Sequence, residues 1–274
     1  MNKFGICEWS LPISGPCAIQ LAGEIGYNGI QLGEAGGASM GFPLNNKRVQ
    51  EIYMESSSAY KVEFQALNLG ALLSSGDMNF PRGNSRGDMA DLSLRKGFEA
   101  CKALKVPKVV ITFDSDNEET FVNNLYHVRY AEELSQETGV GITVETAMTL
   151  PRIMRMLEEI SPDDGICMDL LNPLRFGTGD PIEQIQAFGD RIDHFHLKDS
   201  TKDLFIKGQR GCVLLGTGNA GLESSIRLIK ELGLQGWFIT ENYYQFPPMN
   251  DGNKDFISLA SLDLEYMRNM LNEY

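Results

Sequence analysis

Short apolar runs alternate with longer segments of helical periodicity along the whole chain. The apolar runs are rich in Ile, Val and Phe, as is typical of buried strands, and they occupy residues 4–9, 29–32, 63–68, 108–112, 141–145, 166–169, 192–197 and 237–241. The helical segments cover residues 17–25, 46–60, 89–104, 120–138, 150–159, 182–188, 221–232 and 255–272. Strands alternating with helices imply a parallel sheet covered by those helices. Eight such units favour an α/β fold in the form of a single (β/α)₈ TIM barrel.

No stretch has the composition of a linker, so residues 1–274 are expected to form one domain. The longest irregular segment is predicted at residues 70–87, where Gly, Ser and Pro gather after the third strand. A substrate lid and an ordinary βα loop are equal alternatives for it. Residues 208–220, with four glycines, are similar. No G-x-G-x-x-G follows the first strand, which weakens a dinucleotide-binding alternative.

Composition narrows the classes of partner. The chain carries 24 Lys and Arg against 37 Asp and Glu, and its formal net charge of −13 disfavours binding to nucleic acid. No apolar run approaches the roughly 20 residues that a membrane span needs, and the first residues lack a secretory signal, so a cytoplasmic location is expected. The five cysteines are scattered without a C-x-x-C pair, so buried reduced thiols are favoured over disulfides or a thiolate zinc site.

Acidic or imidazole side chains close four successive apolar runs. Glu145 ends GITVE, Asp169 ends GICMD, His196 lies in IDHFHL, and Glu241 ends WFITE. The active site of a (β/α)₈ barrel lies at the carboxyl ends of its strands, so these side chains can meet there. A buried carboxylate is costly unless a positive partner meets it, and a shared metal ion would be such a partner. Separate strand-end residues, solvated at the barrel rim or salt-bridged, are the alternative.

Three carboxylates and one imidazole suit a hard divalent cation. Mn²⁺ is favoured, with Mg²⁺, Co²⁺ and Zn²⁺ as alternatives, because zinc sites more often hold two or three histidines. His194 shares strand parity with His196 and is either an outer support of the site or a core histidine.

These segments resemble the sugar-phosphate isomerase/epimerase family of xylose-isomerase-like barrels. The resemblance covers nearly the whole chain and includes LAGEIGYNGIQL, GITVET, GICMDL, DHFHLKD and the long segment from LGTGNAG to WFITEN. It implies that Glu145, Asp169, His196 and Glu241 hold one divalent metal. It further implies that Glu145 and Glu241 act on opposite faces of a sugar: one removes a proton beside the metal-bound carbonyl to give a cis-enediolate, and the other returns a proton.

Two positions depart from the pattern of the ketohexose epimerases in this family. Asn172 stands where they carry a histidine, and Lys202 stands where they carry an arginine. Asn172 can donate a hydrogen bond but cannot carry a proton, and Lys202 keeps the charge without the bidentate fork. Both remain candidate substrate contacts, but these departures leave the substrate open.

Further candidate substrate contacts lie at the predicted catalytic rim: Lys198, Glu34, Asn68 and Trp9. Trp9 offers a face for stacking on a sugar, or it is a core aromatic at the barrel mouth. Lys198 contacts a substrate oxygen or forms a salt bridge with a neighbouring carboxylate.

The leading hypothesis is a metal-dependent isomerase or epimerase that acts on a small carbohydrate. The alternative is a lyase on the same scaffold, because the same proton abstraction drives elimination. Inosose dehydratases and the large subunit of C-glycoside deglycosidases, which act on 3-keto-glycosides, resemble this chain equally. A homo-oligomer is expected, or a hetero-oligomer with a small β-rich subunit if the protein is a deglycosidase. Apurinic-site endonucleases resemble this barrel too, but they use many histidines on a basic groove. This acidic chain has three histidines, which disfavours a role in DNA repair.

Overall fold

Parallel strands form the centre of the molecule and close into a barrel. In a computed structural model that describes residues 1–115, 117–203 and 211–271, eight strands pair in chain order from β1 to β8, and β8 pairs with β1. The strands are β1 (Lys3–Cys7), β2 (Gly29–Gly33), β3 (Glu63–Asn68), β4 (Lys108–Thr112), β5 (Gly141–Glu145), β6 (Gly165–Asp169), β7 (Ile192–Leu197) and β8 (Trp237–Thr240). The predicted TIM barrel is therefore confirmed.

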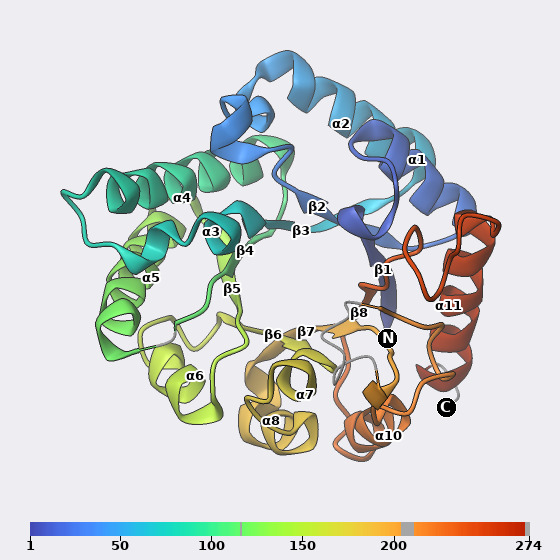
Figure 1. Ribbon diagram of the computed structural model, residues 1–274. Coiled ribbons are helices and arrows are strands. Elements are labelled where there is room, and N and C mark those ends of the chain that lie inside the picture. Colours follow the sequence, from blue (N-terminus) through green and yellow to red (C-terminus); the bar gives the residue numbers. More distant parts are fainter. Residues whose placement is uncertain (116, 204–210, 272–274) are drawn as a thin grey trace.

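Helices surround this barrel in a ring (Figure 1). They are α1 (Pro16–Ile25), α2 (Lys47–Tyr60), α3 (Gly70–Ser75), α4 (Ser85–Leu104), α5 (Glu118–Thr138), α6 (Leu150–Leu157), α7 (Asn172–Phe176), α8 (Pro181–Phe188), α10 (Leu222–Glu231) and α11 (Phe256–Leu271). Several begin at a side chain that caps the first turn, as Asn46 does by accepting hydrogen bonds from the backbone N–H groups of Arg48 and Val49. Within the described ranges, no helix combines the length and apolar character required to cross a membrane.

The barrel differs from the sequence-based prediction at the end of the first strand. β1 ends at Cys7 rather than at residue 9, and Trp9 lies in the 3₁₀ helix Glu8–Ser10. The buried Glu8 carboxylate causes this turn, because it accepts hydrogen bonds from the backbone N–H groups of Gly15 and Gly33 and so ties the loop after β1 to the end of β2. This places the Trp9 side chain over the barrel mouth.

The segment predicted to be irregular at residues 70–87 is largely helical. It contains α3, the 3₁₀ helix Asp77–Asn79 and the first turn of α4. Glu34 fixes α3 to the end of β2, because its Oε1 accepts a hydrogen bond of 2.6 Å from the backbone N–H of Ala71. In the second glycine-rich segment, residues 208–210 lie outside the described residues. The described part is tied to the end of β7, because the Asp199 carboxylate accepts hydrogen bonds from Gly216 and Gly218.

Strand register brings the carboxyl ends of the later strands to one level. Thr112 pairs with Glu145 across β4 and β5, and Asp169 pairs with His196 across β6 and β7. The apolar core lies between the sheet and the helices and includes Ile30 and Leu32 of β2. Alternate residues point inward, and several of those are polar and buried: Gln31, Gln65, Thr143 and His194. The barrel interior therefore has a polar layer beneath its mouth.

Candidate metal centre and active site

The four predicted metal ligands meet at the carboxyl end of the barrel. Glu145 and Asp169 are the last residues of β5 and β6, His196 lies one residue before the end of β7, and Glu241 directly follows β8. One ligand atom from each lies within 4.8 Å of the ligand atoms of the other three, and all four residues are buried. The structure thus brings together the complete set that the sequence singled out.

The imidazole of His196 lies between the two glutamates. Its Nδ1 is 3.3 Å from Glu145 Oε1 and 3.3 Å from Glu241 Oε2. Among the described residues, this buried nitrogen has no hydrogen-bond partner, and an unpaired buried nitrogen is costly. A ring nitrogen that faces carboxylate oxygens without a hydrogen bond fits a ligand of a shared cation.

Lys198, next on the inward face after His196, contacts two of the carboxylates. Its Nζ lies 2.8 Å from Asp169 Oδ2 and also pairs with Glu241 Oε2. Among the described residues, three carboxylates, this contacting ammonium and a neutral His196 ring leave two negative charges, which a divalent cation balances. The donor set therefore fits such an ion in charge as well as in geometry.

Burial and charge have opposite effects on these acids. Burial disfavours ionisation of Glu241, but the positive charge of Lys198, joined by that of His196 when its ring is protonated, outweighs it and lowers the pKa of the Glu241 carboxyl well below its usual value. At Asp169 burial outweighs the attraction of Lys198 and raises the pKa of the carboxyl. Burial also opposes the charge on Lys198, yet Asp169 and Glu241 together raise the pKa of its ammonium. Glu241 and Lys198 are therefore charged at neutral pH.

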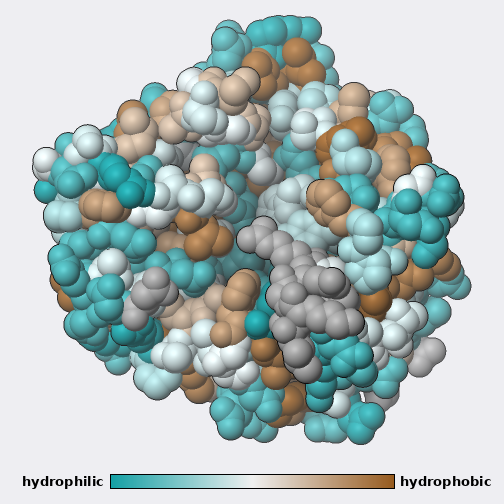
Figure 2. Space-filling model, viewed as in Figure 1, coloured by the Kyte–Doolittle hydropathy of each residue, from teal (hydrophilic) through white to brown (hydrophobic). Residues whose placement is uncertain are grey.

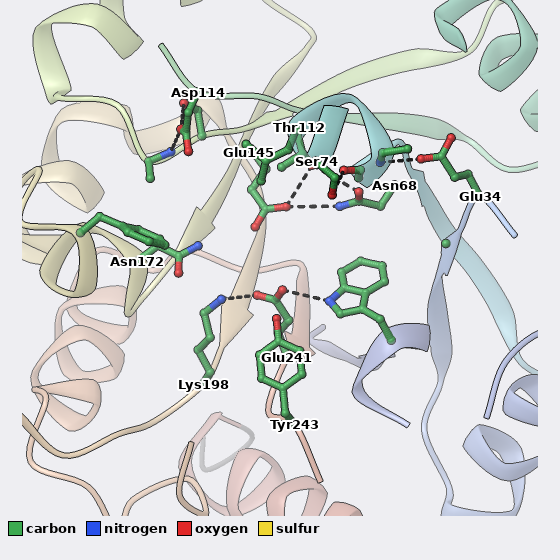
Figure 3. Close-up of a pocket in the computed structure, with 18 of the residues that line it drawn as sticks. Glu34, Asn68, Ser74, Thr112, Asp114, Glu145, Asn172, Lys198, Glu241 and Tyr243 are labelled. Carbon is green, nitrogen blue, oxygen red and sulfur yellow. Dashed lines mark hydrogen bonds and ion pairs between the residues drawn. The ribbon is translucent and has the colours of Figure 1, made fainter. Parts of the chain in front are cut away.

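The ends of β3 and β4 and the 3₁₀ helix after β1 supply hydrogen-bond donors to the two glutamates. Asn68 Nδ2 donates to Glu145 Oε2 at 3.2 Å, and the Thr112 hydroxyl lies 3.3 Å from the same oxygen. Trp9 Nε1 donates to Glu241 Oε1 at 3.0 Å. Figure 3 shows Glu145 and Glu241 extending toward one another from opposite sides, each with its donors beside it. Each carboxylate is thereby held in one orientation.

A cavity of about 520 Å³ opens above these residues, within the usual range for small-molecule sites. Figure 2 shows hydrophilic residues in the hollow at the centre of this face. Of the predicted substrate contacts, five line the cavity: Trp9, Glu34, Asn68, Asn172 and Lys198. Lys202 is exposed, and its backbone N–H donates to Asn219 Oδ1. It is absent from the described lining, so its contact with a substrate stays a prediction.

Other residues at the site were not singled out from the sequence. Thr112 ends β4, so its strand-end position was a signal that could have identified it. Asp114 lines the cavity and accepts hydrogen bonds from Thr146 Oγ1 and the backbone N–H of Ala147, which holds the loop after β5. Gln31 donates and accepts hydrogen bonds inside the barrel, and its signal was a polar residue at an inward position of an apolar strand.

Comparison with known proteins agrees with this fold. The family described as xylose isomerase-like TIM barrel matches residues 19–261. The chain belongs to this family. The predicted resemblance to sugar isomerases and epimerases is therefore confirmed at the family level.

Individual relatives of this xylose isomerase-like barrel are distant in sequence. A 2-epi-5-epi-valiolone 7-phosphate 2-epimerase from an Actinoplanes species is 25% identical over 234 residues, which cover 83% of this chain and 82% of that protein. A D-allulose 3-epimerase from Methylomonas sp., solved in complex with D-allulose, superposes with a TM-score of 0.75 at 17% identity, covering 98% of this chain and 97% of the other. The IOLI protein, solved with a bound zinc atom, gives a TM-score of 0.74 at 17% identity and 99% coverage of both chains.

Proposed function

We propose that the protein is a divalent-metal-dependent isomerase or epimerase that moves a proton at the carbon beside the carbonyl of a sugar or sugar-like ketone. The observation that supports this most directly is the pair of buried carboxylates, Glu145 and Glu241, that extend toward one another at the floor of a cavity of sugar-binding size. Family membership supports the same class of reaction.

Glu145, Asp169, His196 and Glu241 would hold the metal, because their ligand atoms converge and His196 Nδ1 has no hydrogen bond within the described structure. When bound, a divalent ion would polarise the substrate carbonyl as a Lewis acid and so acidify the neighbouring C–H. Mn²⁺ is our first choice for a site with three carboxylates and one imidazole. Mg²⁺, Co²⁺ and Zn²⁺ are the alternatives, and the zinc in the IOLI protein makes Zn²⁺ a necessary comparison.

The two glutamates would perform the proton transfers. Glu241 is an ionised carboxylate at neutral pH, because the positive charge of Lys198 lowers the pKa of its carboxyl, so it can accept a proton. Glu145 approaches from the other side of the site (Figure 3). Removal of a proton by one carboxylate and delivery of a proton by the other to the opposite face would invert that carbon. Delivery to the adjacent carbon would instead interconvert ketose and aldose.

The remaining cavity residues would position the substrate. Asn172 begins α7 and Lys198 follows β7, so their polar groups reach the cavity from the same side as Asp169. Asn68 and Trp9 line the opposite side and already donate to the catalytic carboxylates. Substrate hydroxyls would therefore lie between two sets of polar groups, with the Trp9 ring available for C–H contacts.

A second candidate function is a lyase reaction on a larger glycosidic ketone. A further cavity of about 510 Å³ adjoins the first, shares Trp9 and Glu34 with it, and extends along Leu11, Pro12 and Ile13. This extension would accommodate an aglycone beyond the sugar. The predicted homo-oligomer, or a small β-rich partner subunit in the deglycosidase case, stays a prediction.

Proton exchange in D₂O tests both candidates. The protein is stripped of metal, reloaded separately with Mn²⁺, Mg²⁺, Co²⁺ or Zn²⁺, and incubated with free and phosphorylated ketoses, inososes and 3-keto-glycosides, followed by NMR. We expect deuterium to enter beside the carbonyl together with a new epimer or aldose. The metal-free protein is the matched control and should give no exchange.

The outcomes separate the candidates. Loss of water or of an aglycone would assign the chain to the lyases. Equal exchange by the metal-free and metal-loaded protein would contradict the metal-dependent mechanism. Metal loading without exchange on any compound would contradict this substrate class for the isolated chain.

A further inference from the structure

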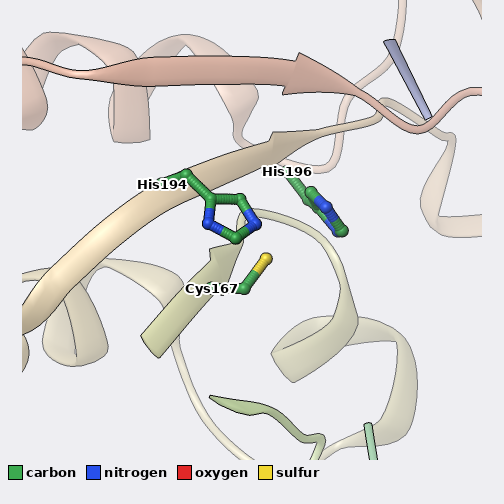
Figure 4. A group of neighbouring side chains, drawn as sticks. All are labelled: Cys167, His194 and His196. Atoms are coloured by element: carbon green, nitrogen blue, oxygen red, sulfur yellow. The ribbon is translucent and has the colours of Figure 1, made fainter. Parts of the chain in front are cut away.

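A second cluster of potential ligands lies directly beneath the metal centre. Cys167, His194 and His196 are all buried and close enough together to hold an ion (Figure 4). However, both ring nitrogens of His194 already have hydrogen-bond partners: Nδ1 lies 2.8 Å from Asp193 Oδ2, and Nε2 lies 3.0 Å from Gln31 Nε2. The cluster therefore fits a hydrogen-bonded support for His196 better than a second metal site.

The direction of each hydrogen bond follows from the groups at the amino end of the barrel. Asp193 is paired with Lys108 and accepts a hydrogen bond from the Thr143 hydroxyl, as an ionised carboxylate does. A carboxylate can only accept, so His194 Nδ1 must carry the hydrogen. In the neutral ring, His194 Nε2 is then an acceptor.

Gln31 bonds to both histidines, so the hydrogen-bond direction at His194 fixes the direction at His196. Because His194 Nε2 accepts, the neighbouring Gln31 Nε2 must be the amide group that donates, and the same nitrogen donates to Gln65 Oε1 at 3.1 Å. The Gln31 Oε1 atom is then directed to His196 Nε2 at a distance of 2.8 Å, and the Cys7 thiol also donates to this oxygen. An amide oxygen only accepts, so His196 Nε2 carries the hydrogen.

We propose that Gln31 is a positioning residue that holds His196 in the tautomer with a free lone pair on Nδ1, the atom between Glu145 and Glu241. This inference rests on the proposed metal function and adds to it the residue that prepares the site. The reverse tautomer would direct an N–H into the centre, where a metal ligand needs a lone pair.

A glutamine suits this position because it is neutral and has both a donor and an acceptor. It is fully buried inside the barrel, where a charged side chain would be costly. The β2–β3 register shifts between Ile30 and Gln31, where Gln65 of β3 is skipped, so the position of this amide depends on an irregularity in the pairing of the two strands as well as on its sequence.

Two measurements test the proposal. The first is the nitrogen NMR of ¹⁵N-histidine-labelled metal-free protein, which is tractable because the chain contains 3 histidines. We expect His196 to be protonated at Nε2 and His194 at Nδ1. The second is divalent-metal affinity, measured by titrating Mn²⁺ or Zn²⁺ into metal-free Gln31→Met and wild-type protein. Because the variant removes the acceptor for His196, we expect affinity to fall by about 10–100-fold.

Gln184→Met is the matched control, because Gln184 is a buried glutamine of α8, outside the barrel interior. Its affinity should equal that of the wild type. A neutral His196 ring with its hydrogen on Nδ1 in the wild-type spectrum would overturn the proposal, as would unchanged metal affinity of folded Gln31→Met. The wild-type spectrum reports the tautomer of His196 even if the Gln31→Met variant does not fold. If the wild-type protein binds no divalent ion, the proposed function fails, and the tautomer still decides the role of Gln31.

Discussion

The two halves of the barrel contribute different groups to the same site. The ends of β5 to β8 supply Glu145, Asp169, His196 and Glu241, together with Lys198. The strands and loops of β1 to β4 supply neutral groups that bind those side chains: Trp9, Gln31, Asn68 and Thr112. Charged ligands thus come from one half, and most of the hydrogen bonds that orient them come from the other. Substitutions in the two halves should therefore differ in kind.

The largest effect is expected from the β5–β8 half. Glu145→Gln or Glu241→Gln keeps the size of the side chain but removes its ability to take up a proton, so turnover should fall by roughly 10²–10⁴-fold. Circular dichroism and thermal unfolding should show an intact fold. Glu137→Gln, at an exposed position of α5, is the control and should retain full activity. A fully active Glu241→Gln enzyme would refute the assignment of the chemistry to this half.

An intermediate effect is expected from Asp263 of α11, which contacts the segment after β8, and it concerns stability rather than turnover. Asp263 of α11 is buried and accepts hydrogen bonds from Asn242 Nδ2 and the Tyr244 hydroxyl, so it anchors the segment that follows Glu241. Burial raises the pKa of its carboxyl from 3.8 to about 6. The folded state therefore holds an extra proton between these pH values.

The sign of the resulting pH dependence follows from that proton. As pH rises from about 4 to about 6, the free energy of unfolding should fall by on the order of 2–3 kcal/mol through Asp263 alone. Denaturant unfolding across this range, compared with Asp263→Asn, measures the contribution. The variant should be less stable overall, because an amide nitrogen cannot accept these hydrogen bonds. It should also lack the Asp263 contribution to the fall of the unfolding free energy between about pH 4 and about pH 6. Identical slopes would show that Asp263 does not titrate in this range.

The smallest effect is expected from the β1–β4 half. Trp9→Phe keeps an aromatic ring but removes the donor to Glu241, so kcat/KM should fall by about tenfold. Trp237→Phe is the matched control, because the other tryptophan of the chain begins β8 at the amino end of the barrel and should affect turnover little. A loss in Trp9→Phe as large as that in Glu241→Gln would erase the distinction between the two halves.

Much of the fold was predictable because short segments of the sequence carry the patterns of its strands and helices. The alternation of apolar runs and helical periodicity identified eight strands close to their observed bounds, since burial of a parallel strand on both faces needs a continuous apolar run. The prediction failed where a distant contact decides the local structure. The first strand was predicted to continue to Trp9, because Trp9 lengthens the apolar run. In the structure the strand ends at Cys7, where the Glu8 carboxylate binds the backbone N–H groups of residues 15 and 33. The helix α3 was missed for a similar reason, because Glu34 binds its first turn.

For the site, the sequence by itself determined the strand-end acids and the histidine, because a residue type at the end of a strand has a fixed place in a parallel barrel. Only the tertiary structure decided how those groups are held. Gln31, Thr112 and Trp9 are separated from their partners by many residues, and which of them meet depends on the closure of the barrel and on the register shift between β2 and β3. Hydrogen bonds act over about 3 Å, so that register had to be known before the contacts of Gln31 could be identified.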